Sequence, residues 1–175
     1  MKHQKDRLEA IIRTAFKEVQ LEDGVGLWQA QGLDDYVDEK TMQELIRKDE
    51  REDWSIIPTE HLIHCASSLS FFDAKGMRFH LPAFMLLDIS LENPVDAVTF
   101  TLGYDLEGDY QNKRFSLLNS EQIRCITYFL EDKLELIKRT YKELYGLEAD
   151  AFHLNDLTYN QIQEALLYWQ HKIVR

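Results

Sequence analysis

The sequence predicts a mainly α-helical protein that folds as a single compact multi-helix domain over residues 1–175. Three observations lead to this fold class. Only seven glycines and three prolines interrupt the chain, which favours long helices over many short strands. Hydrophobic residues recur every three or four positions in several stretches, as on one face of a helix. The composition, 45% hydrophobic and 29% charged, is typical of a globular protein.

The first quarter of the chain is expected to contain two helices. An amphipathic helix opens the sequence and ends near Gly24, since its apolar residues share one stripe: Leu8, Ile11, Ile12, Ala15, Phe16 and Val19. Residues 27–40 show no clean period, so we expect a loop or a short turn there. A second helix is expected from Glu39 to about Glu50.

The middle of the chain is expected to hold the centre of the core. Residues 73–76 (Asp-Ala-Lys-Gly) indicate a turn. The pattern leaves open whether a small β-hairpin near residues 70–81 crosses this turn or whether the turn separates two helices. Pro82 suits the first turn of a helix that runs to about Leu91. Because that helix is apolar on all sides, we expect it to be buried.

The second half of the chain contains the clearest helix. Residues 93–102 combine a helix-start signal, Asn-Pro, with β-forming residues, so helix and strand both stay open there. A helix of about 25 residues then begins within residues 118–122 and ends at Gly146. Its near-heptad apolar seam also allows a coiled-coil dimer, so the oligomeric state is unknown. A last helix is expected from about Thr158.

Negative charge is concentrated in two segments. Residues 34–53 carry nine acids against four bases, and residues 92–109 carry five acids and no base, so each has a net charge of −5 out of −11 for the chain. If the segments share a face, their field would attract a basic partner and speed its association. Alternatively, both are solvated edges that face different directions. The predicted partner-binding residues are the carboxylates Asp34, Asp35, Asp38, Asp105, Glu107 and Asp109.

The overall charge argues against two classes of partner. With 20 Lys and Arg against 31 Asp and Glu, we expect neither a nucleic-acid-binding surface nor docking on an anionic membrane. No signal peptide or membrane span is apparent, so a cytoplasmic location is expected. Cys65 and Cys125 lie within helical apolar patterns and are expected to be buried free thiols.

Patterns for catalysis and metal binding are weak, which favours a non-enzymatic protein without a cofactor or a metal. There is no glycine-rich phosphate loop, nucleophile elbow or zinc-protease motif. His61, His64 and Cys65 have a spacing that could bind zinc, but no fourth ligand is evident. Residues 105–109 resemble part of a calcium loop, yet Ser116 stands where an EF-hand requires glutamate.

A small enzyme or ligand-binding domain is the alternative function. Its pocket would be formed by His64, Asp73, Arg78 and His80, because an imidazole near neutral pKa can act with a carboxylate in acid–base chemistry. The simpler expectation is that Asp73 pairs with Arg78 and braces the turn between them.

The stretch LSFFDAKGMRFHLPAF, residues 69–84, carries a resemblance to a known family. Together with Trp54, Ile57 and Pro58 before it and residues 115–130 after it, this stretch resembles an uncharacterised bacterial domain-of-unknown-function family over about residues 54–130. The resemblance implies no activity, cofactor or catalytic residue.

We therefore expect a non-enzymatic protein-interaction domain of the bacterial cytoplasm. In its most specific form, this would be an immunity or inhibitor protein whose acidic face covers a basic effector such as a nuclease toxin. The concentrated acidity and the missing catalytic motifs lead to this expectation.

Overall fold

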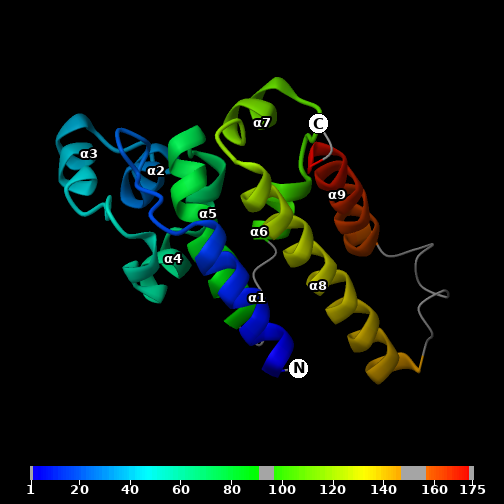
Figure 1. Ribbon diagram of the computed structural model, residues 1–175. Coiled ribbons are helices and arrows are strands. Elements are labelled where there is room, and N and C mark those ends of the chain that lie inside the picture. The colour runs from blue at the N-terminus through cyan, green and yellow to red at the C-terminus, as the bar shows by residue number, and fades with distance from the viewer. Residues whose placement is uncertain (1, 91–96, 147–156, 174–175) are drawn as a thin grey trace. The chain divides into compact units, whose positions relative to one another are not determined.

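The computed structural model describes residues 2–90, 97–146 and 157–173, and all regular elements within these ranges are helical. The elements are α1 (Lys2–Ala15), α2 (Leu27–Asp34), α3 (Glu39–Ile46), the 3₁₀ helix η1 (Trp54–Ile56), α4 (Thr59–His64), the 3₁₀ helix η2 (Ala66–Ser70), α5 (Ala74–Ser90), α6 (Ala97–Gly103), α7 (Asp109–Arg114), α8 (Ser120–Tyr145) and α9 (Leu157–Ile173). The mainly helical fold class is confirmed (Figure 1).

The chain divides into two compact units, residues 1–118 and residues 119–175, which we call the N-terminal and the C-terminal unit. The organisation as a single domain stays a prediction.

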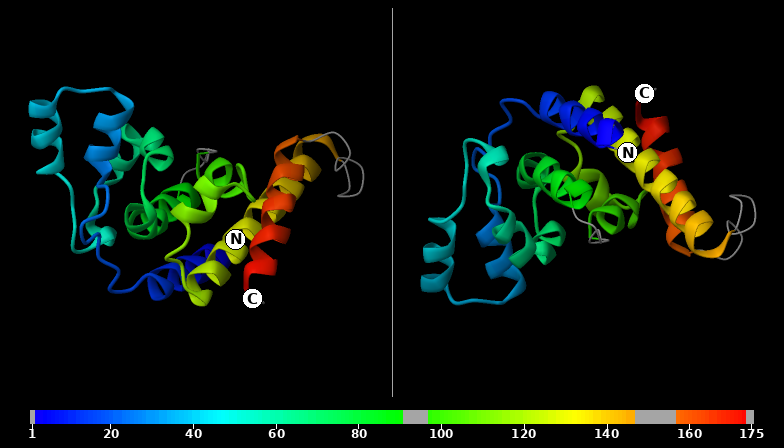
Figure 2. Two further views of the ribbon diagram at one scale, coloured as in Figure 1. Left: turned by 90° about the horizontal axis from the view of Figure 1, so that it is seen from above. Right: turned by 90° about the horizontal axis from the view of Figure 1, so that it is seen from below.

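Helix α5 is the centre of the N-terminal unit. It packs against α1, α4, α6, α7 and η1. Within this unit, α2 and α3 lie on one side of α5, and α6 and α7 lie on the other (Figures 1 and 2). Its residues from Phe79 to Met85 are all buried, as expected for a helix that is apolar on all sides.

The start of α5 corrects two expectations about residues 70–81. No β-hairpin forms there. Helix η2 ends at Ser70 and α5 begins at Ala74, so a break between two helices is present, as in the other alternative, but it lies at residues 71–73 and residues 74–76 are already helical. The Asp73 carboxylate accepts the backbone N–H of Gly76 at 2.8 Å and so caps the helix N-terminus. Helix α5 therefore begins eight residues before Pro82, and this proline lies inside the helix and not in its first turn. Pro82 is buried there, and its ring cannot donate the backbone hydrogen bond of an ordinary helical residue.

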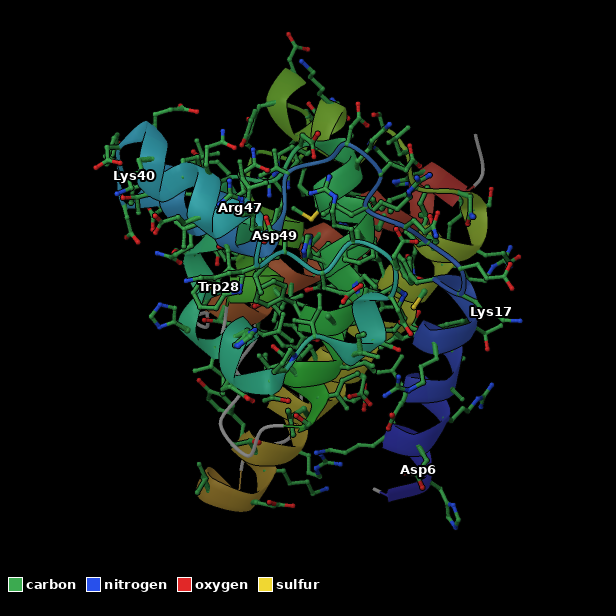
Figure 3. All side chains as sticks on the ribbon, turned by 90° about the vertical axis from the view of Figure 1, so that its left-hand side faces the viewer. Asp6, Lys17, Trp28, Lys40, Arg47 and Asp49 are labelled. Carbon is green, nitrogen blue, oxygen red and sulfur yellow. The ribbon has the colours of Figure 1, made fainter. Side chains whose placement is uncertain are left out.

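Helix α2 was not expected, because residues 27–40 were predicted to form a loop or a short turn. Its N-terminus is capped from a distance by the Asp49 carboxylate, which accepts the backbone N–H groups of Trp28 at 2.6 Å and Gln29 at 3.4 Å. Asp49 and Trp28 lie next to each other in Figure 3. A cap supplied by a residue some twenty positions away leaves no local signal in the sequence.

Helix α6 answers part of the question left open for residues 93–102. Residues 97–103 are helical, although they include the β-forming residues Val98 to Thr101. The helix-start signal Asn93-Pro94 lies outside the described residues, as do the acidic residues Glu92 and Asp96.

The C-terminal unit consists of α8 and α9, which pack along each other in opposite directions (Figure 1). The long helix expected after residue 118 is confirmed and has 26 residues. At its start, Asn119 and Gln122 form a reciprocal capping box with bonds of 2.9 and 3.1 Å. At its end, Gly146 has a left-handed φ of 64°. Within the described residues, no helix has both the length and the apolar composition needed to cross a membrane.

Candidate functional site

The first acidic segment surrounds the end of α2 and the start of α3. Asp35 accepts a hydrogen bond from the Gln31 side chain at 3.1 Å, one turn earlier in α2. Asp38 caps α3 by accepting the backbone N–H of Thr41 at 2.8 Å, which lowers the pKa of this carboxyl below its usual range. Asp34 is half-buried, whereas Asp35 and Asp38 are exposed. The end of α2 thus presents several carboxylates within a few residues.

The second acidic segment joins α6 to α7. Asp105, Glu107 and Asp109 are all exposed. Asp105 has a left-handed backbone with φ of 45° and lies against Gly108, the N-cap of α7. Among the residues that the structure describes, none of the six predicted carboxylates forms an ion pair with Lys, Arg or His.

The short helix η2 links the two acidic segments within the N-terminal unit. On one side, the Ser67 hydroxyl donates to the Gln31 side chain at 3.2 Å. On the other side, the Tyr110 hydroxyl donates to the carbonyl oxygen of Ser70 at 2.7 Å. Gln31 also binds Asp35, and Tyr110 follows Asp109 directly in sequence. The two acidic segments consequently lie at the two ends of η2, whose Ser67 and Ser70 side chains are exposed.

Exposed aromatic rings accompany both acidic segments, and the sequence patterns did not reveal them. Tyr36 is 91% exposed beside Asp35. Next to the second segment, Phe100 and Tyr104 stack at 5.2 Å between ring centroids, and Tyr110 is also exposed. Aromatic rings are enriched in the energetic centres of protein interfaces. The sequence signal was their position within or directly beside the acidic segments, which is weak because aromatic residues are more often buried.

Three of the four residues of the predicted pocket are engaged in local structure around α5. Asp73 accepts the backbone N–H of Val25 at 3.0 Å in addition to capping α5. Arg78 forms an ion pair with Glu22 at 2.9 Å, which corrects the expected pairing with Asp73. Lys75 also contacts Glu22, at 2.6 Å, and its hydrogen bond lowers the pKa of the Glu22 carboxyl. These contacts join α5 to the segment that follows α1.

His80, the third of these residues, is fully buried. Its Nδ1 atom lies 2.8 Å from the carbonyl oxygen of Gly76, and its ring stacks on Phe72 at 4.4 Å. Burial lowers the pKa of His80 to about 4, so the ring is neutral at physiological pH. The His80 imidazole is therefore part of the packed core of the N-terminal unit.

His64, the fourth residue of the predicted pocket, is the last residue of α4. His61 and His64 pack against the Trp28 ring at centroid distances of 5.0 and 5.4 Å. Cys65 is buried, as expected, and burial raises the pKa of its thiol to about 12. Cys125 is buried with the same consequence for its pKa. Within the described ranges, no three His, Cys, Asp or Glu side chains are placed to hold a metal ion.

Comparison with known proteins adds one match. A protein-family model described as "Family of unknown function (DUF6714)" matches residues 4–172. The match extends well beyond residues 54–130, on which the resemblance was based. The comparisons found no matching curated protein and no matching solved structure.

Proposed function

We propose a function for this chain as a member of DUF6714, the family of unknown function to which it belongs: a non-enzymatic protein-interaction domain that binds a basic protein. The binding surface consists of Asp34, Asp35, Asp38, Asp105, Glu107 and Asp109 with the exposed rings beside them, and we call it the acidic surface. In its most specific form, the proposal is an immunity or inhibitor protein of the bacterial cytoplasm that covers a basic effector such as a nuclease toxin.

One observation carries this proposal. Carboxylates that form no ion pair with a described residue occur together with exposed aromatic rings at both ends of η2, to which Gln31 and Tyr110 are hydrogen-bonded. The exposed side chains of η2, Ser67 and Ser70, are small and uncharged, so a partner segment could cross it and place cations at both acidic segments. This arrangement supports the hypothesis that the two segments act on one partner.

The electrostatic reasoning follows from the position of the charges. Exposed carboxylates that lack a nearby cation keep their full field, and this field steers a basic protein toward the surface. The rings supply apolar area and cation–π contacts for Lys and Arg side chains once the partner has docked. We therefore expect the charges to govern mainly the association rate and the rings mainly the dissociation rate.

The proposal predicts a strong effect of charge reversal on association. The surface variant combines Asp34→Lys, Asp35→Lys, Glu107→Lys and Asp109→Lys. It leaves Asp38 and Asp105 unchanged, because these two residues have local structural roles. The partner would first be captured from the native host, eluted with salt, identified by mass spectrometry and purified. We expect its association rate, measured by stopped flow at low salt, to fall about 10- to 100-fold.

A matched control variant has the same net charge as the surface variant. It combines Asp6→Lys, Glu60→Lys, Glu143→Lys and Glu164→Lys, which replace exposed acids outside the acidic segments. We expect this variant to lose much less of the association rate. Equal rates for the wild-type protein and the surface variant, or equal losses in both variants, would contradict a localised electrostatic surface. A captured partner that is acidic would contradict the proposal as a whole.

A further inference from the structure

The end of α2 has an unusual residue in a common turn. The backbone N–H of Tyr36 bonds to the carbonyl oxygen of Leu33 at 3.4 Å, and that of Val37 bonds to the carbonyl oxygen of Gly32 at 3.1 Å. This pair of bonds defines a Schellman motif, which requires a left-handed residue just after the helix. Tyr36 occupies that position with φ of 52°. Glycine or asparagine is the usual choice there, because a bulky side chain clashes with its own backbone.

The two hydrogen bonds of the Schellman motif hold the backbone of Tyr36, but its side chain adds no stabilising contact within the described part of the protein. The Tyr36 side chain is 91% exposed, and no hydrogen bond or ring contact involves it there. A left-handed backbone also occurs at Glu18, Glu22 and Asp105, so strain by itself does not mark a functional residue. Tyr36 differs from these three because it presents a large, exposed aromatic ring, the kind of side chain that dominates binding energy in protein interfaces.

The other exposed rings of the acidic surface have partners of their own. Tyr104 stacks on Phe100, and Tyr110 donates to Ser70 while the Arg114 guanidinium lies over its ring at 5.1 Å. Tyr36 differs from them because both faces of its ring and its hydroxyl face solvent. Its sequence neighbours Asp34 and Asp35 bear carboxylates that would attract the same cationic groups.

We infer that Tyr36 is the aromatic anchor of the acidic surface and inserts into a pocket lined by Lys or Arg on the basic partner. This inference rests on the proposed function and specifies the chemistry of the partner. The guanidinium or ammonium groups would contact the ring face, while Asp34 and Asp35 would bind neighbouring cations at the rim. Tyrosine is among the residues that dominate binding energy when they are enclosed in this way.

The test separates the cost of Tyr36 for folding from its benefit for binding. In the full chain, Tyr36→Gly relieves the strained backbone and removes the ring. We expect the thermal midpoint to stay constant or to rise by up to about 3 °C. The affinity for the purified basic partner should fall about 30-fold, mainly through faster dissociation. Tyr36→Phe retains the ring and should restore most of the affinity.

Glu18 provides a matched control for the backbone. It is also an exposed, non-glycine residue with a left-handed backbone, with φ of 62°, and it lies outside the acidic segments. Glu18→Gly should relieve the same kind of strain without changing the affinity. Tyr36→Asn repeats the test of the ring with a side chain present at position 36, because asparagine also tolerates the left-handed conformation.

Three outcomes would overturn the inference, and they are distinguishable. If Tyr36→Gly binds as tightly as the wild-type protein while the charge-reversal variant does not, the anchor is wrong and the proposed function stands. If the thermal midpoint falls by more than about 5 °C in both Tyr36→Gly and Tyr36→Asn, the ring has a structural role instead. If no basic protein binds the wild-type chain, the inference and the proposed function both fail.

Discussion

Substitution of Gly76 by alanine is expected to lower the free energy of unfolding by about 2 kcal/mol. A methyl group at this position would lie far inside van der Waals contact with the carbonyl oxygen of Val25, and 3.0 Å from the Asp73 carboxylate. The Val25 backbone cannot withdraw easily, because its N–H donates to Asp73 at 3.0 Å. The resulting overpacking costs about 3 kcal/mol. This exceeds the gain of about 1 kcal/mol from the higher helix propensity of alanine.

Gly32 provides the matched control, because it is also buried within a helix. A methyl group there would meet side-chain atoms and no backbone atom, namely the Leu45 Cδ1 atom at 2.8 Å, the Met42 Cε atom at 3.1 Å and the Val37 Cγ2 atom at 3.2 Å. These atoms can move at little cost, so Gly32→Ala should be neutral or slightly stabilising. Urea unfolding followed by circular dichroism would compare the variants. Equal stability of the two alanine variants would show that the close approach of Gly76 to Val25 is absent.

The stability of the protein is expected to depend on pH through Asp49. Burial raises the pKa of this carboxyl from 3.8 to about 6, against the effect of the hydrogen bonds from Trp28 and Gln29. The folded state therefore binds a proton more tightly than the unfolded state. As the pH falls from above 6 to below about 4, protonation of Asp49 stabilises the fold. A pKa shift of about two units corresponds to a gain of up to about 3 kcal/mol in the free energy of unfolding.

Asp49→Asn removes this titration, so the difference in stability between the wild-type protein and this variant measures its effect. We expect the wild-type protein to gain stability relative to the variant between pH 7.5 and pH 4, with most of the change between pH 6 and pH 4. Urea unfolding of both proteins at several pH values would give the difference directly. A difference that does not vary with pH would contradict the burial of an ionisable Asp49.

Asp38→Asn is a control of opposite sign. Both carboxylates cap a helix, but the pKa of exposed Asp38 is lowered by its bond from Thr41. Its contribution to stability is therefore present above the unfolded-state pKa of 3.8 and is lost as the pH falls below it. Relative to Asp38→Asn, the wild-type protein should lose stability on acidification. The two variants thus distinguish a half-buried cap from an exposed one.

The candidate site was only partly predictable from the sequence. Its six carboxylates were identified by counting charges, because acidic side chains remain exposed in almost any fold. The aromatic rings beside them were not, because an aromatic residue is buried or exposed according to which helices pack over it. Tyr36 illustrates this point, since its exposure and its left-handed backbone follow from the way α2 ends.

The sequence by itself determined the helices whose signals are local. Helix α8 has its apolar stripe, the cap at Asn119 and Gln122 and the stop at Gly146 within one continuous stretch, so its bounds could be predicted closely. These signals act between residues at most four positions apart, and they do not depend on the rest of the fold.

Only the tertiary structure decided the elements that depend on distant residues. Asp73 and Gly76 suit either a turn or a helix start, and the contacts with Val25 select the helix start. Helix α2 depends on its cap from Asp49, and Arg78 finds its partner in Glu22. The physical reason is the same in each case: a hydrogen bond or an ion pair is decided by distance in space. Residues 20 to 60 positions apart meet only after the chain has folded.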